Sequence, residues 1–348
     1  MRLPLLLLLV AVVSWLLTGL IRRYALARNL LDIPNARSSH QVPTPRGGGL
    51  AIVGTFLAAL PVLAWFDYLA WPVLVCLLGA GAWVALVGWW DDHGHIPARW
   101  RLLAHFAGAA WVLAWLGGPP SLSVLGVAVE LGWLGYPLAA LYLVWLLNLY
   151  NFMDGIDGIA AIEAITVCLG GALVHWLLLP GEPGWILPLL LAAAVAGFLG
   201  WNFPPARIFM GDGGSGFLGL MLAALSLLAA RSAPELLWCW LILLGVFVVD
   251  ATFTLARRVL RREKFYEAHC SHAYQHAARR IGVHRPVSLA VGLINLGWLL
   301  PLALLVAQGS LEGLPAVLIA YGPLVGLAFY FGAGVHNQGP ARSQVNGK

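Results

Sequence analysis

Residues 135–179 decide the fold, and they read "GYPLAALYLVWLLNLYNFMDGIDGIAAIEAITVCLGGALVHWLLL". Two apolar runs flank the polar segment "NLYNFMDGIDGIA" at 148–160, and each is close to the roughly 20 residues that cross a bilayer as a helix. The segment holds two carboxylates, Asp154 and Asp157, and two amides, Asn148 and Asn151. We therefore expect two membrane spans that meet at a polar site.

The same apolar pattern extends over the whole chain. Hydrophobic residues make up 61% of the 348 residues and charged residues 10%, far below the roughly 25% of soluble domains. This predicts an all-α polytopic membrane protein, a single domain over 1–348, with about eleven transmembrane helices. They are expected near residues 4–20, 48–66, 72–90, 102–117, 136–150, 158–179, 186–202, 214–230, 236–256, 287–307 and 315–333. A short external hairpin is predicted near 121–135, which is rich in glycine and alternates around Val127.

The distribution of Lys and Arg predicts the orientation. With the N-terminus outside and the C-terminus cytoplasmic, all of the 20 Lys and Arg residues lie inside except Arg2 and Arg231. Such a bias agrees with the positive-inside rule. The net charge of +5 then belongs to the cytoplasmic face, where it suits anionic head groups or phosphates and not nucleic acid.

Five aspartates fall at the cytoplasmic ends of predicted spans. Asp91 and Asp92 lie in "GWWDDHGHIP" (88–97), Asp154 and Asp157 in the segment above, and Asp212 in "NFPPARIFMGDGGSGFLG" (202–219). One such aspartate is explained by a helix end meeting water, but the acidic residues of the outer side occur singly and without flanking Gly or Asn. Carboxylates and amides that converge are typical Mg²⁺ ligands beside phosphates. A Gly-rich turn that opens a helix binds phosphate well, so the pattern predicts diphosphate–Mg²⁺ chemistry.

The largest cytoplasmic loop, 257–286, reads "RRVLRREKFYEAHCSHAYQHAARRIGVHRP". Its residues His269, His272 and His276 would share one face if the segment were helical. Three hypotheses compete: a transition-metal site, a basic loop on anionic lipid, and a loop that contacts a sugar and a diphosphate. Carboxylate or cysteine partners at metal-site spacing are scarce, so we favour the third.

Together, these motifs resemble those of the polyprenyl-phosphate N-acetylhexosamine-1-phosphate transferases. The motifs are "DIPNARSSHQVPTPRGGGLAI" (32–52), "WWDD", "NLYNFMDGIDGIA", "NFPPARIFMGDGGSG" and "HCSHAYQH" (269–276), in the order that the family has. The resemblance implies transfer of a sugar 1-phosphate from a UDP-sugar to undecaprenyl phosphate, with release of UMP. It also implies a Mg²⁺ requirement, with Mn²⁺ tolerated, and a place in the bacterial inner membrane with the active site on the cytoplasmic face. A homodimer is a further expectation.

The resemblance also implies roles for individual residues. Asp212 and Asn151 match Mg²⁺ ligands, and Asp91 and Asp92 match the pair near the polyprenyl phosphate, with Asp91 as the base. Asp154 and Asp157 match aspartates around the nucleotide, with Asp157 facing uracil. The remaining substrate contacts are expected at His40, Asn148, Asn202, Phe209 (stacked on uracil), His269, His272 and Arg279.

Finer expectations concern the sugar. The muramoyl-pentapeptide branch has a lysine near the position of His40 and a triple histidine in place of "HCSHAYQH", so this chain is more similar to the WbpL-like branch that initiates O-antigen synthesis. That branch implies a 6-deoxy N-acetylhexosamine, such as N-acetylfucosamine or N-acetylquinovosamine, with N-acetylglucosamine or N-acetylgalactosamine as the alternative. A polytopic transporter or flippase is the competing class. It would place ionisable residues at midplane depth, where only Asp250 occurs. Arg257, two turns on, favours a structural ion pair or a site near the cytoplasmic face instead.

Overall fold

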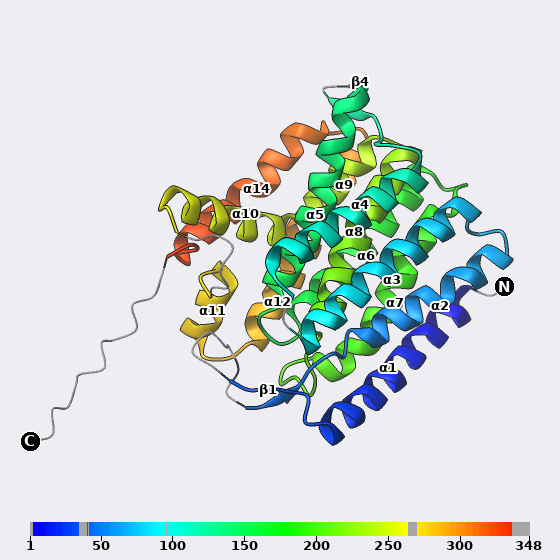
Figure 1. Ribbon diagram of the computed structural model, residues 1–348. Helices are drawn as coiled ribbons and strands as arrows, with labels where there is room; N and C mark the ends of the chain where they lie inside the picture. Colours follow the sequence, from blue (N-terminus) through cyan, green and yellow to red (C-terminus); the bar gives the residue numbers. More distant parts are fainter. Residues whose placement is uncertain are drawn as a thin grey trace, which may run out of the picture.

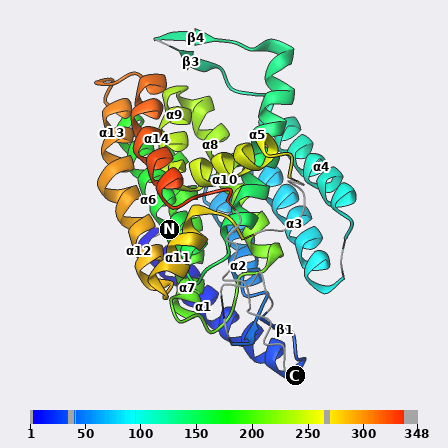
Figure 2. The ribbon, with the colours of Figure 1, turned by 90° about the vertical axis from the view of Figure 1, so that its left-hand side faces the viewer.

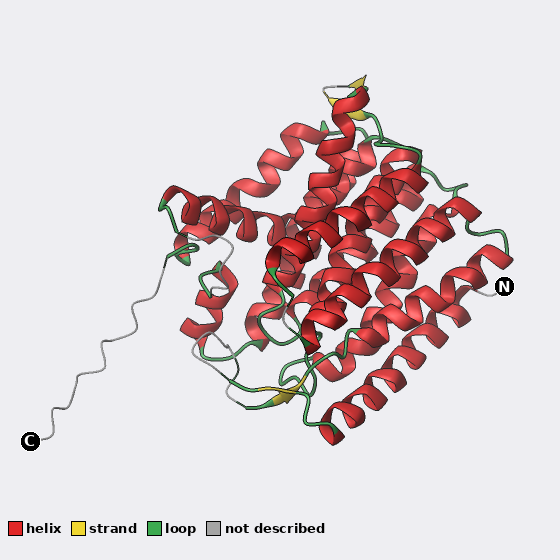
Figure 3. Ribbon diagram, viewed as in Figure 1, coloured by secondary structure: helices red, strands yellow, loops and turns green. Residues whose placement is uncertain are grey.

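The computed structural model describes residues 3–34, 40, 42–94, 96–124, 126–263 and 270–335, and helices dominate them (Figures 1 and 3). The helices are α1 Leu3–Ala27, α2 Leu50–Trp65, α3 Trp71–His93, α4 Ala98–Leu116, α5 Gly135–Met153, α6 Ile159–Leu178, α7 Ile186–Asn202, α8 Asp212–Ser232, α9 Glu235–Leu243, α10 Gly245–Leu260, α11 Ala273–Ile281, α12 Arg285–Ile294, α13 Leu300–Ala307 and α14 Gly313–Tyr330. Short helical turns lie at η1 Gly132–Leu134 and η2 Pro183–Trp185, and a π-helical turn, η3, spans Asn295–Leu299.

The long helices run side by side in one bundle (Figure 1). Among the described residues, eight helices are long and apolar enough to cross a membrane, or nine if one bent pair counts as a single span. The apolar helix α2, at 16 residues, is shorter. The prediction of an all-α polytopic membrane protein is therefore confirmed, whereas the count of eleven spans and the orientation stay predictions.

The predicted span at 236–256 is wrong as a single helix. Helix α9 ends at Leu243 and α10 begins at Gly245, at an angle of 71°, so α10 crosses the bundle helices (Figure 1). The hydroxyl of Tyr321 donates to the carbonyl of Leu241 over 2.7 Å. In a continuous helix that carbonyl would accept the amide of Gly245. A side chain that enters the backbone ladder in this way kinks a helix.

The predicted hairpin is confirmed. Strands β3 (Leu122–Val124) and β4 (Val127–Val129) pair antiparallel. A second small sheet, β1 (Leu31–Asp32) with β2 (Thr44–Pro45), is also antiparallel. Both views place the two sheets at opposite ends of the bundle (Figures 1 and 2), so the bundle has one hairpin end and one end near β1.

Helix α8 forms the centre of the bundle, and nearly all of its side chains are buried. Its first turn is held by backbone contacts from two sides. A Cβ atom added to Gly88 of α3 would lie 2.6 Å from the Cα atom of Gly213, and one added to Gly49 would lie 2.5 Å from the Cα atom of Gly214. Only glycine permits such close approach of two backbones. These contacts fix the N-terminus of α8, and with it Asp212.

Candidate active site

Three helix ends meet at the end of the bundle near β1. Helix α3 ends with Asp91 and Asp92, α5 ends just before Asp154, and α8 begins at Asp212. The sequence predicts that all three helix ends lie at the same membrane boundary. The structure thus brings together aspartates that are up to 121 residues apart, as the hydrogen bond between the Gly213 amide and Asp92 shows.

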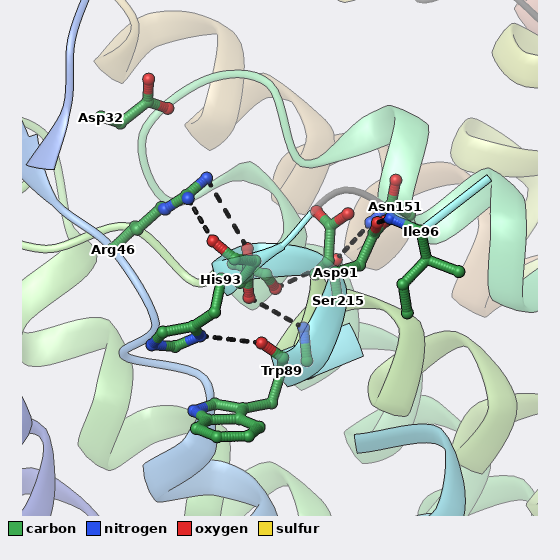
Figure 4. A network of polar contacts seen from close by, with 12 residues as sticks. Asp32, Arg46, Trp89, Asp91, His93, Ile96, Asn151 and Ser215 are labelled. Atoms are coloured by element: carbon green, nitrogen blue, oxygen red, sulfur yellow. Dashed lines mark hydrogen bonds and ion pairs between the residues drawn. The ribbon is translucent and has the colours of Figure 1, made fainter. Parts of the chain in front are cut away.

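Only 5% of the side chain of Asp91 is exposed. Its Oδ1 atom accepts the amide of Ile96 over 2.9 Å, and its Oδ2 atom accepts a hydrogen bond from Arg101. The same Nη1 atom of Arg101 lies 4.0 Å from Oδ2 of Asp212. Figure 4 shows Asp91 and Ile96 side by side. Arg101 therefore links the aspartate of α3 to that of α8.

Asp92 joins three separate segments. Its Oδ2 atom accepts a hydrogen bond from the amide of Gly213 over 3.3 Å. Its Oδ1 atom lies 4.0 Å from Nη1 of Arg46, and its backbone carbonyl accepts a hydrogen bond from the same arginine. The chain that follows Arg46 is itself held to the loop before α8, because Gly48 and Gly49 donate their amides to the carbonyls of Phe209 and Met210, both over 2.9 Å. Asp92 thus holds Arg46, and with it the segment 44–49, at the site.

The two asparagines of α5 line the same space. The Nδ2 atom of Asn151 donates to Oγ of Ser215 over 3.1 Å, as Figure 4 shows, and its side chain also contacts Asp212. Asn148 donates to the carbonyl of Val144 over 2.7 Å. A narrow pocket between α3, α4, α5 and α8 is lined by Asp91, Arg101, His105, Asn148, Asn151 and Asp212. The predicted Mg²⁺ ligands, Asn151 and Asp212, are therefore neighbours.

Asp154 stands where negative charge is concentrated. Burial raises the pKa of its carboxyl well above the usual value, and the charges of Asp212, Asp157 and Asp92 raise it further. Like charges this close disfavour ionisation unless a cation compensates them. Among the described residues, no three His, Cys, Asp or Glu side chains could enclose a metal by themselves. A Mg²⁺ ion, which keeps several waters and shares its shell with substrate phosphates, needs only one or two carboxylates, and the donors present fit that mode.

Asp157 has two partners for its carboxylate. Its Oδ2 atom accepts the amide of Ala206 over 3.0 Å, and its Oδ1 atom lies 3.1 Å from Nδ1 of His284. Its carbonyl accepts the hydroxyl of Ser288 over 2.7 Å. Burial alone would raise the pKa of Asp157, but the hydrogen bonds from His284 and Ala206, with the charges of His284 and His40, lower it below the usual value. The 154–158 loop is thereby fixed to the start of α12.

The predicted nucleotide contacts occupy two different environments. The rings of His40 and Phe209 pack edge to face, with 4.8 Å between their centroids, beside the segment 44–49. Asn202 is only 3% exposed, and both ends of its amide are used: Oδ1 accepts the amide of Gly158 and Nδ2 donates to the carbonyl of Ile208, each over 3.0 Å. In this arrangement Asn202 supports the loops around the site, and its contact with a nucleotide stays a prediction.

The histidines of the segment 257–286 do not lie along one helix, which differs from the pattern considered in the sequence analysis. Helix α11 begins only at Ala273, so His272 caps the helix and does not share a helical face with His276. His269 lies outside the described residues. His272 is 2% exposed, with Nδ1 3.3 Å from Oδ1 of Asp250. Arg279, in contrast, is exposed and donates to the carbonyl of Cys270.

Asp250 joins α10 to α11. Its carboxylate accepts the amides of Ala273 and Tyr274 over 2.9 and 3.0 Å, in addition to the contact with His272. The ion pair expected with Arg257 is not what the described contacts show, because Arg257 donates to the carbonyl of Ala333 over 3.1 Å. The hydroxyl of Tyr274 donates to the carbonyl of Phe152 over 3.0 Å. The first turn of α11 is therefore attached directly to the end of α5, beside Asn151 and Asp154.

Four residues of the site were absent from the predicted set: Arg46, Arg101, Ser215 and His284. The sequence identified the two arginines only as charges of the inner face, and the histidine only as one of four in a loop. A signal existed for Arg101, because Pro97 precedes the start of α4 at Ala98 and Arg101 lies in the first turn of this helix, which packs against α3. No comparable local signal points to His284, whose partner is 127 residues away.

Comparison with known proteins finds relatives that cover most of the chain. A family model described as glycosyl transferase family 4 matches residues 74–230. A probable undecaprenyl-phosphate N-acetylglucosaminyl 1-phosphate transferase of Bacillus subtilis is 31% identical over 80% of this chain and 78% of its own. A decaprenyl-phosphate N-acetylglucosaminephosphotransferase of Mycobacterium tuberculosis is 34% identical, over 81% of this chain and 77% of its own. A phospho-N-acetylmuramoyl-pentapeptide-transferase of Thermosynechococcus vestitus is 32% identical, over 72% and 68%. With helix-end aspartates gathered at one end of a membrane bundle and relatives of this similarity and coverage, the chain belongs to glycosyl transferase family 4.

Proposed function

We propose that the protein transfers an N-acetylhexosamine 1-phosphate from a UDP-sugar to undecaprenyl phosphate and releases UMP. One observation carries the proposal: Asp91, Asp92, Asp154 and Asp212 meet around the first turn of α8, with Arg101 and Arg46 among them. Acidic and basic groups in one place at a membrane boundary suit two reacting phosphates, of which one is attached to a lipid. Relatives named for this kind of transfer support the proposal.

The reaction joins two phosphates, so the enzyme must hold like charges in line. An oxygen of the lipid phosphate forms a bond to the sugar-linked phosphorus while the bond from that phosphorus to UMP breaks. Asp212 and Asn151 would hold Mg²⁺, which when bound supplies charge stabilisation to the diphosphate. Asp91, whose carboxylate accepts the Ile96 amide and a hydrogen bond from Arg101, is the proposed base for the proton of the lipid phosphate. Positioning and charge stabilisation of this kind account for most of phosphoryl-transfer catalysis.

Direct transfer is the route that the contacts of Asp157 support. A double displacement needs a nucleophilic carboxylate, and the contacts of Asp157 with Ala206 and His284 stabilise its charge and lower its pKa, which makes it a weaker nucleophile. Asp154 is the remaining candidate nucleophile. Enzyme incubated with a UDP-sugar labelled in the sugar, without lipid acceptor, should form no covalent adduct. A labelled peptide that contains residue 154 would establish the two-step route instead.

The finer proposal is a 6-deoxy sugar, in the synthesis of O-antigen on the cytoplasmic face of the inner membrane. It rests on the departures at His40 and in "HCSHAYQH", whereas the names of the relatives refer to N-acetylglucosamine and to a muramoyl pentapeptide. A site that lacks a partner for a 6-hydroxyl rejects the hydroxylated sugar by only about 10²-fold. If UDP-N-acetylglucosamine has a kcat/KM that is higher by about tenfold or more, the 6-deoxy assignment is wrong while the transferase assignment remains.

The decisive experiment is an assay of UMP release. Purified protein is incubated with undecaprenyl phosphate, Mg²⁺ and each of a panel of UDP-N-acetylhexosamines. UMP should form with at least one sugar, only with lipid phosphate present, and not after chelation of the metal. A folded protein that releases no UMP with any sugar of the panel would refute the proposal. The transporter hypothesis predicts instead that sugar or lipid crosses a vesicle membrane without UMP.

A further inference from the structure

A buried polar cluster lies deeper in the bundle than the aspartates. Glu163, on the second turn of α6, is fully buried, and Asn295, at the start of η3, is 1% exposed. The Nδ2 atom of Asn295 donates to Oε2 of Glu163 over 2.6 Å and to Oγ1 of Thr166 over 2.8 Å. A carboxyl group within a membrane bundle is costly to bury, so its presence calls for a function.

The cluster continues a line of contacts between α6 and α12. Along α12, His284, Ser288, Gly292 and Asn295 follow at intervals of four, four and three residues, so they share one helical face. His284 and Ser288 bind Asp157. Next, a Cβ atom added to Gly292 would lie 3.0 Å from Cγ2 of Ile162, so the side chain of Ile162 packs closely against the backbone of α12 there. Asn295 completes the line at Glu163. The same face of α12 therefore follows α6 from the 154–158 loop into the membrane.

Two helices in lipid have little hydrophobic reason to keep one register, because lipid tails are as apolar as Leu and Val. Small residues and interhelical hydrogen bonds set the register instead. Here the Glu163–Asn295 bond is the deep anchor and the Asp157–His284 contact is the shallow one. A shift of α12 by one turn, about 5.4 Å, would remove His284 and Ser288 from Asp157. The deep anchor thus controls whether the shallow contacts form.

We propose that Glu163 is a positioning residue: through Asn295 it fixes the register of α12 on α6, and thereby holds the Asp157 loop in its binding conformation. The proposal rests on the proposed function, since it concerns the loop expected to bind the nucleotide. Glu163 itself touches no reacting atom, and it acts over a distance of two helical turns. Loss of the anchor should weaken substrate binding more than it slows the chemical step.

The test compares Glu163→Leu with Glu163→Gln in steady-state UMP release. Glu163→Leu should raise the KM for the UDP-sugar about tenfold, the scale of a strong interhelical hydrogen bond in a membrane, and change kcat by less than about threefold. Glu163→Gln, whose amide oxygen still accepts from Asn295, should stay within about twofold of the wild type. In hydrogen exchange of the purified proteins, Glu163→Leu should speed exchange at 154–158 and 284–288, and Glu163→Gln should not.

A second variant and a matched control make the test strict. Asn295→Leu should raise KM at least as much as Glu163→Leu does, because it also removes the bond to Thr166. The loss in the double variant should be less than additive, because both changes remove the Glu163–Asn295 bond. His175→Leu changes another buried polar residue of α6, near the hairpin end, and should leave KM and local exchange unaltered. Unchanged KM and exchange in Glu163→Leu, additive losses in the double variant, or equal effects of His175→Leu would each overturn the proposal. If the wild type releases no UMP, the proposed function fails, and the exchange data alone then decide on the anchor.

Discussion

Replacement of Arg101 by alanine tests how the aspartates of α3 and α8 are held together. Arg101 is 30% exposed and pairs with Asp91, of which 5% is exposed. A hydrogen bond to a charged group contributes about 1.5–3 kcal/mol. The second contact, 4.0 Å from the 40% exposed Asp212, counts as a surface pair of about 0–1 kcal/mol. If both act in the transition state, Arg101→Ala costs about 1.5–4 kcal/mol.

At about 1.4 kcal/mol for each factor of ten, this cost is a loss of roughly 10- to 700-fold in kcat/KM. Arg101→Lys keeps the charge but loses the planar fork, so we expect its loss to lie between the wild type and Arg101→Ala. The assay is UMP release at varied lipid phosphate, with far-ultraviolet circular dichroism as a check of folding. A folded Arg101→Ala protein with wild-type kcat/KM would refute this account of the site. Arg99, two residues away and exposed, supplies the control, and Arg99→Ala should stay within about threefold.

Three further predictions concern charge and metal. Asp212→Asn should abolish transfer while the protein still inserts and folds. Asp67→Asn, between α2 and α3 at the other end of the bundle, should leave activity nearly unchanged. Equal losses of activity would show that the aspartates were misinterpreted. Because the pKa of Asp157 is lowered in the folded protein, its stabilising contribution is full above the unfolded value of about 3.9 and is lost only as pH falls further. Asp157→Asn should therefore flatten the dependence of melting temperature on pH below about 4 and not near neutrality. His272→Ala should lower activity without changing bound zinc, and stoichiometric zinc in the purified wild type would contradict this.

Much of the fold could be predicted because it follows from local pattern. Apolar runs locate the helices, and the alternation near Val127 locates the β3–β4 hairpin. The bend after Leu243 could not be predicted in this way, since hydropathy is a sum over neighbours in sequence. The bend depends on the hydroxyl of Tyr321, 80 residues away, at the carbonyl of Leu241. Neither residue carries a signal that marks the contact.

Some residues of the candidate site could likewise be predicted from local sequence, and others could not. Asp91, Asp154 and Asp212 could be placed together because each stands at a helix end that topology assigns to one side of the bundle. His272 could not be placed, since its side chain depends on a partner, Asp250, that an apolar helix carries at its buried face. Glu163 belongs to the same class, because in sequence it resembles any polar residue at the start of a span. Only the three-dimensional structure shows which polar residues meet.

The glycine contacts around the first turn of α8 have a genetic consequence. Every missense change in a glycine codon adds at least a Cβ atom. At Gly88 and Gly214 that atom would lie 2.6 Å from the backbone of a neighbouring segment. A backbone, unlike a side chain, cannot relieve the clash by changing its rotamer. Inherited loss of activity should therefore arise at these glycines as readily as at the aspartates, although the glycines carry no chemistry. The codons that tolerate no missense change should therefore include these glycine codons as well as those of the reactive aspartates.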